Sequence, residues 1–126
     1  MHEEAKSKLI VFFFGLRNNL YLYHLSTYKY SRHVAVGTLV DTFDDLIDKF
    51  LEIFFGKYGR PDTFPETMIR LCKLSDSEAL FELNTYIDFL NNDVSTLVST
   101  TDTDLLNIRD EMVGILNNNK YLFLLK

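Results

Sequence analysis

Apolar residues recur every three or four positions over long stretches of the chain, and this spacing constrains the fold more than any other feature. Such spacing places apolar side chains on one face of an α-helix. The first stretch predicts a helix over about 4–27, and the second predicts one over about 31–57. The residues that carry the pattern are Leu9, Phe13, Leu16, Leu20 and Tyr23, followed by Val36, Val40, Phe43, Ile47, Phe50 and Phe54.

Two further helices are predicted in the second half of the chain. Ser75 and Glu78 form an S-x-x-E capping box, which predicts the start of a third helix whose apolar spacing continues to Leu97. A fourth helix follows residues 99–104 (STTDTD). Because no stretch alternates with period two for long enough to form a sheet, we predict an all-α bundle. Its first two helices are antiparallel neighbours, and a long crossover over about 58–75 joins the second helix to the third.

The size and composition of the chain favour one soluble domain. A chain of 126 residues can bury its own core, so a single domain over 1–126 is predicted. Its single cysteine, Cys72, excludes an internal disulfide and fits a reducing compartment, so a cytoplasmic protein is expected. The apolar run at 9–16 is too short to cross a bilayer and lacks a signal-peptide cleavage pattern, so no membrane association is expected.

The first two predicted helices carry more apolar surface than one core requires. Two explanations are open: a wide buried face within a compact bundle, or a subunit interface formed by these helices. The additional residues are Ile10, Phe14, Tyr21 and His24 on the first helix and Leu51 and Phe55 on the second. They lie beside a line of Asp41, Asp45, Asp48 and Glu52.

Two histidines and two carboxylates form a candidate metal site. His24 ends the first predicted helix and His33 begins the second, so the turn can bring them together, while Asp48 and Glu52 lie one helical turn apart. At about 1.5 Å per residue, His33 and Asp48 are roughly 22 Å apart along one helix, whereas bonds from these groups to a metal are ~2 Å long. One chain therefore cannot bring all four to one ion. His2, near a terminus predicted to be mobile, is given no role.

A two-fold axis removes this difficulty. If the second helix packs antiparallel to its symmetry mate near 41–43, the histidines of one subunit face Asp48 and Glu52 of the other, and the dimer contains the site twice. Imidazole and carboxylate together suit Fe(II), Mn(II) or Zn(II). A di-iron centre within one bundle would need E-x-x-H motifs, which the sequence lacks. The plainer interpretation is a solvated face with two hydrogen-bonded histidines.

The order of these residues resembles the ferroxidase signature of the Dps-type miniferritins, a branch of the ferritin-like superfamily. In that family, a histidine late in the first helix precedes a second one early in the next helix. An aspartate follows the second histidine fifteen residues later, and a glutamate follows four residues after the aspartate. His33, Asp48 and Glu52 have this spacing. Residues 16–24 (LRNNLYLYH) and 102–125 also resemble the family, so the resemblance spans most of the chain.

The resemblance implies a ferritin-like four-helix bundle with a long crossover between helices 2 and 3, and an iron-storage ferroxidase. Fe(II) is then expected to bind between subunits to His24, His33, Asp48 and Glu52, and to be oxidised by peroxide or dioxygen. Fe(III) would be stored inside a closed homo-oligomer, a dodecamer. Glu52 is the expected bridge between two irons, and Asp44 or Asp45 is expected to assist.

Three departures from the family motivate a second hypothesis, a non-catalytic ferritin-like helical interaction protein. His24 and His33 are separated by a shorter turn than the family usually has. Leu25 replaces a tryptophan that often follows the first histidine, which leaves Tyr28 or Tyr30 as candidate electron sources. The chain also lacks a lysine-rich tail. DNA binding is not expected, because the formal net charge is −5 and phosphate binding requires clustered lysine and arginine.

Overall fold

The computed structural model describes residues 2–126, and all regular secondary structure within this range is helical. The all-α prediction is confirmed for this part of the chain. The predicted helices 4–27 and 31–57 agree with the observed bounds to within two residues. The elements are α1 (His2–Ser26), α2 (Tyr30–Tyr58), α3 (Asp76–Asp88), a π-helical turn η1 (Phe89–Asp93), α4 (Val94–Leu97) and α5 (Thr103–Leu122).

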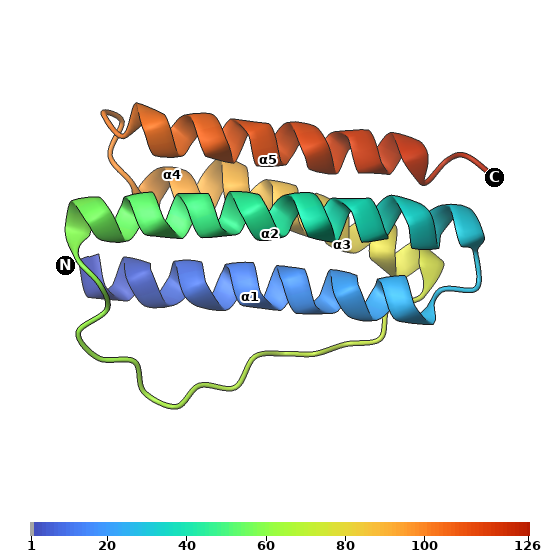
Figure 1. The fold of residues 1–126 in the computed structure, drawn as a ribbon, viewed down its shortest axis with the longest axis horizontal. Helices are drawn as coiled ribbons and strands as arrows, with labels where there is room; N and C mark the ends of the chain where they lie inside the picture. Colours follow the sequence, from blue (N-terminus) through green and yellow to red (C-terminus); the bar gives the residue numbers. More distant parts are fainter. Residues whose placement is uncertain (1) are drawn as a thin grey trace.

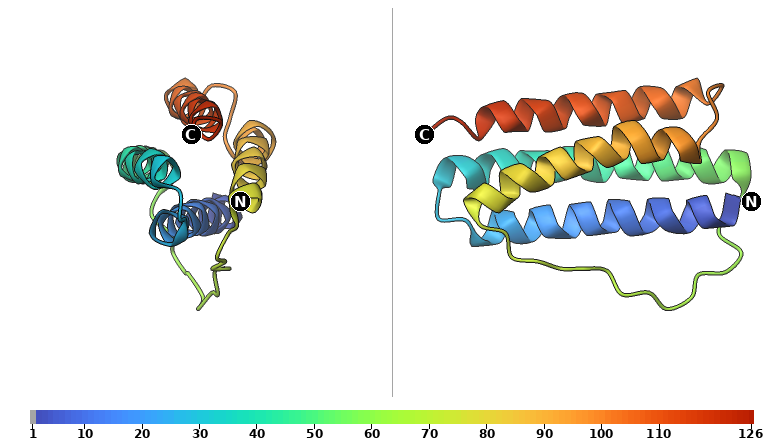
Figure 2. Two further views of the ribbon diagram at one scale, coloured as in Figure 1. Left: turned by 90° about the vertical axis from the view of Figure 1, so that its right-hand side faces the viewer. Right: turned by 180° about the vertical axis from the view of Figure 1, so that it is seen from behind.

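The long helices lie side by side around a shared apolar interior. α1 and α2 are antiparallel and joined by the short turn 27–29, and α2 also packs against α5 (Figure 1). Viewed along the helices, the rod formed by α3, η1 and α4 completes the enclosure between α1 and α5 (Figure 2). Segment 59–75 contains no helix and runs outside α1 from one end of the molecule to the other (Figure 1).

Both predicted core stripes of α1 and α2 are buried. Every residue of the two stripes is at most 7% exposed, and the large rings of Phe13, Phe43, Phe50 and Phe54 are 0% exposed. Because burial of a large apolar side chain contributes about 1.5–3 kcal/mol, these stripes dominate the stability of the fold. Among residues 2–126, every helix is too short or too polar to cross a lipid bilayer.

Side chains of α1 hold the segment between α2 and α3 in place. The buried amide of Asn19 donates to the carbonyl of Arg70 (3.1 Å) and accepts from the backbone N–H of Cys72 (2.8 Å). At the other end, Lys6 donates to the carbonyl of Arg60 (3.2 Å). These bonds satisfy backbone groups that have no helical partner, so this segment packs against α1 without regular structure.

The start of the third helix agrees with its sequence signature. The hydroxyl of Ser75 accepts from the backbone N–H of Glu78 (3.2 Å), and the Glu78 carboxylate accepts from the backbone N–H of Ser75 (2.9 Å). The two hydrogen bonds together form the predicted capping box and begin α3 at Asp76.

The predicted third helix is helical from Asp76 to Leu97, but its middle is a π-helical turn instead of regular α-helix. The turn η1 inserts one extra residue per turn there, and the ring of Phe89 stacks on Phe12 of α1 with centroids 3.7 Å apart. A π turn disturbs the regular helical bonding of nearby carbonyls. Arg109 of α5 donates to the carbonyl of Leu90 (3.2 Å) and the hydroxyl of Ser95 (2.8 Å), which compensates for this disturbance.

A buried carboxylate joins the C-terminal end of α2 to the loop before α5. Asp102 accepts hydrogen bonds from Tyr58, from Lys57 (2.9 Å) and from the backbone N–H of Ser99 (2.9 Å). Burial of the carboxyl opposes ionisation, but the hydrogen bonds from Tyr58 and Lys57 prevail and lower the pKa of Asp102 to about 2. His2, assigned no role from the sequence, lies in α1 and stacks on Tyr58 with ring centroids 4.0 Å apart.

Replacing Asp102 with asparagine is expected to lower the free energy of unfolding by about 1–2 kcal/mol at neutral pH. A carboxyl whose pKa is lower in the folded state stabilises the fold above its unfolded pKa of about 3.9, and this contribution disappears as the pH falls through about 2. Urea denaturation of the parent and variant at pH 7 and pH 2 measures the difference. The control Asp88→Asn, at an exposed carboxylate, is expected to change stability by less than about 0.5 kcal/mol. An Asp102→Asn effect of equal size at both pH values would contradict the electrostatic explanation.

Candidate metal site

The structure brings His24 and His33 together across the short turn between α1 and α2. Their imidazole rings stack with centroids 4.0 Å apart and planes inclined by 13°. Nδ1 of His24 lies 2.8 Å from the backbone carbonyl oxygen of His33, and Nδ1 of His33 lies 2.8 Å from the carbonyl oxygen of His24. Each ring is therefore held by the backbone of the other residue.

These reciprocal hydrogen bonds determine which ring nitrogen is free. A carbonyl oxygen can only accept, so Nδ1 of both histidines must carry the hydrogen. In the neutral imidazole the lone pair is then on Nε2, and within residues 2–126 neither Nε2 has a hydrogen-bond partner. Histidines that bind metals commonly donate their other ring N–H to a backbone carbonyl in this way. Both rings are thus oriented with one unused nitrogen each.

Gly37 provides the space that the ring of His24 occupies. It lies on α2 one turn after His33, and a Cβ atom added there would be 2.8 Å from Cε1 and 3.0 Å from Nδ1 of His24. A side chain at this position would push the ring away from the carbonyl of His33. Any residue other than glycine is therefore incompatible with the observed histidine pair.

A buried polar network lies behind the histidine turn and connects three helices. Tyr23 of α1 donates to the carboxylate of Asp76 at the start of α3 (2.6 Å). Arg32 of α2 donates to the hydroxyl of Tyr23 (3.0 Å) and to the backbone carbonyl of Asp76 (3.0 Å). Burial and the hydrogen bond with Asp76 raise the pKa of Tyr23, and the hydrogen bond from Tyr23 lowers the pKa of Asp76. Because Tyr23 and Arg32 directly adjoin His24 and His33, the network fixes the backbone that carries them.

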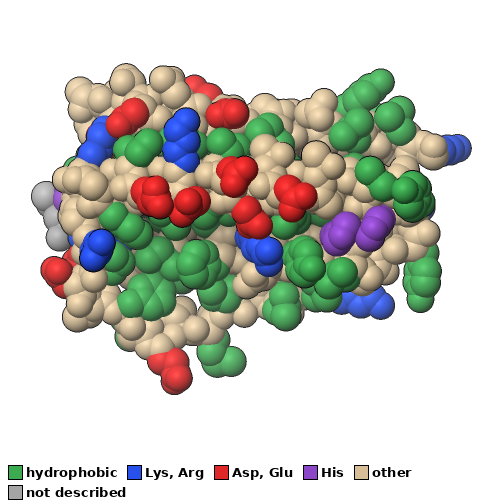
Figure 3. Space-filling view, in the orientation of Figure 1, with side chains coloured by type: hydrophobic (Ala, Val, Ile, Leu, Met, Phe, Trp, Pro, Cys, Tyr) green, Lys and Arg blue, Asp and Glu red, His purple; other side chains and the backbone are tan. Residues whose placement is uncertain are grey.

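Asp48 and Glu52 lie on the same side of the molecule, farther along α2. Both are exposed, and among the described residues neither has an ion-pair partner. Acidic side chains form a row along the middle of this side, and two histidines lie toward one end of it (Figure 3). The two carboxylates are one helical turn apart, so they can bind one ion together.

One copy of the chain does not unite the two pairs. α2 is continuous from Tyr30 to Tyr58, so His33 and Asp48 are separated by roughly 22 Å of helix. Within residues 2–126 no three side chains of histidine, cysteine, aspartate or glutamate lie close enough to hold an ion. Each copy therefore carries the candidate ligands as two separate half-sites, one of imidazole and one of carboxylate.

The neighbouring aspartates differ in their surroundings. The guanidinium of Arg17 on α1 contacts both carboxylate oxygens of Asp44, at 3.0 and 3.4 Å. Asp45 is exposed, and within the described chain it forms no ion pair. Of the two residues expected to assist the site, Asp44 is thus already neutralised and Asp45 is available.

The additional apolar set on α1 and α2 is mostly accommodated within one copy. Leu51 is 9% exposed and belongs to the core, and Ile10 and Phe55 are partly buried against it. For Leu51, and in part for Ile10 and Phe55, the structure agrees with the first explanation, a wide buried face within one bundle. Of this set, Phe14 (47% exposed) and Tyr21 (42% exposed) remain exposed.

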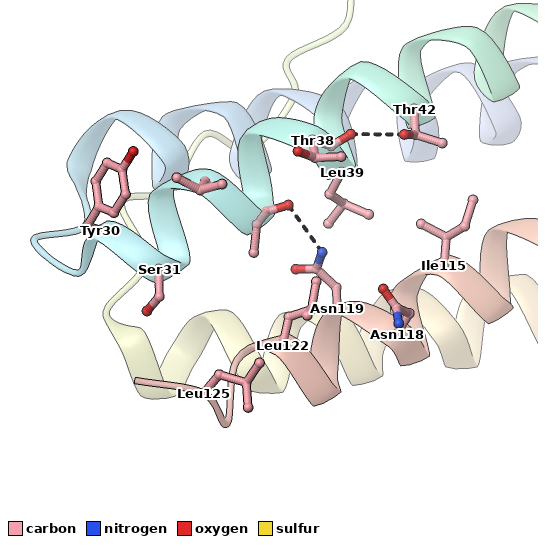
Figure 4. Close-up of a pocket in the computed structure, with 12 residues that line it drawn as sticks. Tyr30, Ser31, Thr38, Leu39, Thr42, Ile115, Asn118, Asn119, Leu122 and Leu125 are labelled. Atoms are coloured by element: carbon pink, nitrogen blue, oxygen red, sulfur yellow. Dashed lines mark hydrogen bonds between the residues drawn. The ribbon is translucent and has the colours of Figure 1, made fainter.

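A hollow of about 510 Å³ lies between α2 and the C-terminal end of α5 (Figure 4). Its walls are mainly apolar, and the amide of Asn119 lies between the helices and donates to the carbonyl of Ala35 (3.3 Å). None of the four candidate metal ligands lines it. The hollow is thus separate from the candidate metal site.

Comparison with known proteins identifies a family but no activity. A family model, described as a family of unknown function (DUF5856), matches residues 24–123. The chain belongs to this family. No curated protein and no solved structure matches it. The part shared with DUF5856 begins at His24 and contains His33, Asp48 and Glu52, so all four candidate ligands lie within it.

Sequence reasoning about this DUF5856 member overlooked Gly37 and the Arg32–Asp76 network. A glycine inside a helix lowers helical stability by about 1 kcal/mol relative to alanine, and such a position often marks a close approach. That signal was present four residues after His33. Arg32 and Asp76 are 44 positions apart, so no local pattern could have connected them.

Proposed function

We propose that this DUF5856 protein is an iron-binding ferroxidase of the miniferritin type, with Fe(II) as its substrate and stored cargo. The reciprocal hydrogen bonding of His24 and His33 is the observation that supports this most. It leaves Nε2 of each ring without a hydrogen-bond partner in the described chain, and histidine and acidic side chains lie on the same side of the molecule (Figure 3). Imidazole and carboxylate are ligands that Fe(II) accepts.

The fold in this proposal is a ferritin-like four-helix bundle. The rod of α3, η1 and α4 counts as its third helix, and segment 59–75 as the long crossover between helices 2 and 3. The antiparallel arrangement of α1 and α2 and the passage of this segment along α1 support that assignment (Figures 1 and 2). Bundles of this kind build metal sites from side chains on facing helices.

The complete site in this proposal forms between two copies related by a two-fold axis. His24 and His33 of one copy and Asp48 and Glu52 of the other bind the same iron, and the axis repeats the site. The neutral imidazoles anchor the metal, and Glu52 bridges two irons where two bind. Asp45 is the nearest additional carboxylate without an ion-pair partner in the described chain.

The reaction oxidises two Fe(II) ions. Each loses one electron, and hydrogen peroxide accepts both as its O–O bond breaks; dioxygen, the other candidate, accepts two electrons to become peroxide. The carboxylates of Asp48 and Glu52 stabilise the higher charge of Fe(III), which makes electron loss easier. The Fe(III) product passes to a mineral enclosed by the assembly.

The proposed assembly is a closed shell of twelve chains, a dodecamer, that is built from two-fold dimers. That number rests on the resemblance to Dps-type miniferritins alone. Further contacts would use apolar side chains exposed near the histidine turn and the chain's C-terminus, where Leu25 is 61%, Tyr30 79% and Leu124 71% exposed. Exposed apolar surface of this kind commonly lies at interfaces between proteins.

A second candidate function is a non-catalytic helical interaction protein. The reciprocal bonds of His24 and His33 favour it in one respect, because they close the turn between α1 and α2 without any metal. In this case the acidic row is a solvated face and the exposed apolar residues contact a partner protein. Metal titration separates the two candidates.

Anaerobic titration with Fe(II), or with Zn(II) as a redox-inert substitute, is expected to give saturable binding of one or two ions per chain. The variant His33→Ala is expected to bind at least about 10-fold more weakly, because it removes one ligand and the bond that orients His24. His2→Ala is the matched control, since it removes the third histidine at the far end of α1. Isothermal titration calorimetry measures affinity and stoichiometry. If the parent protein shows no saturable binding, the interaction protein becomes the better explanation.

A further inference from the structure

One face of the molecule combines the histidine pair, the acidic row and two exposed aromatic rings, and we call it the α1–α2 face. Acidic and histidine side chains gather over α1 and α2 on the side of the molecule that Figure 3 shows. Its members are Phe14, Arg17, Tyr21 and His24 of α1 and His33, Gly37, Asp41, Asp44, Asp45, Asp48 and Glu52 of α2.

The spacing along α2 determines how two such faces must meet to unite the half-sites. The point halfway between His33 and the Asp48–Glu52 turn lies beside Asp41. A two-fold axis at this point places Asp41 of one copy close to Asp41 of the other. Uniting imidazole with carboxylate therefore also brings acidic groups together at the axis.

Charge on this face opposes the pairing of two metal-free copies. Five carboxylates, on Asp41, Asp44, Asp45, Asp48 and Glu52, are exposed, and among the described residues only Asp44 has a cationic partner, Arg17. Carboxylates that approach each other as water is excluded repel more strongly than they do in bulk solvent. Two copies therefore repel each other across this face.

Few large apolar side chains are exposed on the face to offset this repulsion. Leu51 is already buried within one copy, and Ile10 and Phe55 pack partly against the same core. Phe14, Tyr21 and Leu25, which lies one helical turn after Tyr21, remain exposed, at 47%, 42% and 61%. Stable homodimer interfaces bury a much larger and more apolar surface.

We propose that two copies of this chain pair through the α1–α2 face only when divalent cations occupy the site between them. The proposal rests on the function proposed above and adds its regulation: the metal controls assembly. Each ion neutralises carboxylates of one copy and bonds to imidazoles of the other, so it replaces repulsion with attraction. Because only the paired form offers both half-sites, metal binding and pairing increase together. Iron supply would then set the amount of assembled protein.

Light scattering after size-exclusion chromatography tests this, with Zn(II) as the probe because it does not change oxidation state. In EDTA the parent is expected to have the mass of one chain, 14.8 kDa. With a few equivalents of Zn(II) the mass is expected to at least double. The variant Asp48→Asn/Glu52→Gln loses two ligands but is nearly unchanged in shape, and it is expected to stay monomeric with Zn(II).

The charge at the axis gives an independent test. Asp41→Asn removes repulsion without removing a proposed ligand, so it is expected to lower the Zn(II) concentration at half-maximal assembly about 3-fold or more. Asp88→Asn makes the same change in net charge at an exposed position on α3 and is expected to leave that concentration unchanged.

The possible results separate this inference from the proposed function. If the parent binds Zn(II) by calorimetry and already has the mass of a dimer or larger assembly in EDTA, metal-dependent pairing is wrong and the metal site stands. If the parent has the mass of one chain in both EDTA and Zn(II), the pairing and the site between two copies are both wrong. If the parent binds no Zn(II), both are wrong. If Asp48→Asn/Glu52→Gln assembles with Zn(II) as the parent does, the metal acts elsewhere on the surface and the α1–α2 face is not the interface.

Discussion

Replacing Asp48 and Glu52 together with alanine is expected to slow aerobic Fe(II) oxidation about 100-fold or more. In the proposed site these residues supply both carboxylates, so the variant loses charge that stabilises Fe(III) and the groups that complete the site from the second copy. Loss of groups that merely orient metal ligands typically reduces activity or affinity 10–100-fold, and loss of two ligands should have a larger effect. Absorbance of the Fe(III) product after mixing with Fe(II) and peroxide measures the rate.

The matched control removes two acidic residues elsewhere. Asp88 of α3 and Glu111 of α5 are exposed, and Asp88→Ala/Glu111→Ala changes the net charge by the same amount. This variant is expected to oxidise iron at the parent rate. If Asp48→Ala/Glu52→Ala also oxidises iron at the parent rate, these carboxylates are not ligands and the ferroxidase assignment is wrong.

Replacing Gly37 with alanine is expected to weaken Zn(II) binding about 10-fold or more, although it alters no proposed ligand. The new Cβ atom would lie 2.8 Å from Cε1 of His24, so the ring must move and its hydrogen bond to the carbonyl of His33 must lengthen. Nε2 of His24 then leaves its observed position. Calorimetric titration measures the affinity, and circular dichroism confirms that the helices are retained.

Gly114 of α5 provides the matched control. A Cβ atom added there has no atom within 4 Å, so Gly114→Ala should only remove the flexibility of glycine. It is expected to increase the free energy of unfolding by about 0.5–1 kcal/mol and to leave Zn(II) affinity unchanged. If Gly37→Ala binds Zn(II) as tightly as Gly114→Ala does, the orientation of His24 is irrelevant and it is not a ligand.

Features that depend on nearby residues could be predicted well. The bounds of α1 and α2 and the burial of their core stripes follow from apolar spacing within each helix, and Ser75 with Glu78 correctly marked the start of α3. The meeting of His24 and His33 also followed from their places on either side of a short turn. In each case the cause lies within about ten residues of its effect.

Features that depend on packing between helices could not be predicted in this way. The spacing around η1 suits an ordinary helix, yet Phe89 stacks on Phe12 and Arg109 bonds to the carbonyl of Leu90, and both partners come from other helices. Leu51 lies at the border between the core stripe and the outer stripe of α2. Only the position of the neighbouring helices decided that it is buried.

Some features of the candidate site likewise follow from the sequence, and others depend on packing between helices. The number and order of the four candidate ligands, and the roughly 22 Å of helix that keep His33 from Asp48, follow from the chain itself because the rise of an α-helix is constant. The free Nε2 atoms, the space left by Gly37 and the pairing of Asp44 with Arg17 depend on contacts between α1 and α2. Such contacts are decided by tertiary packing, because it alone determines which atoms of distant residues approach within bonding distance.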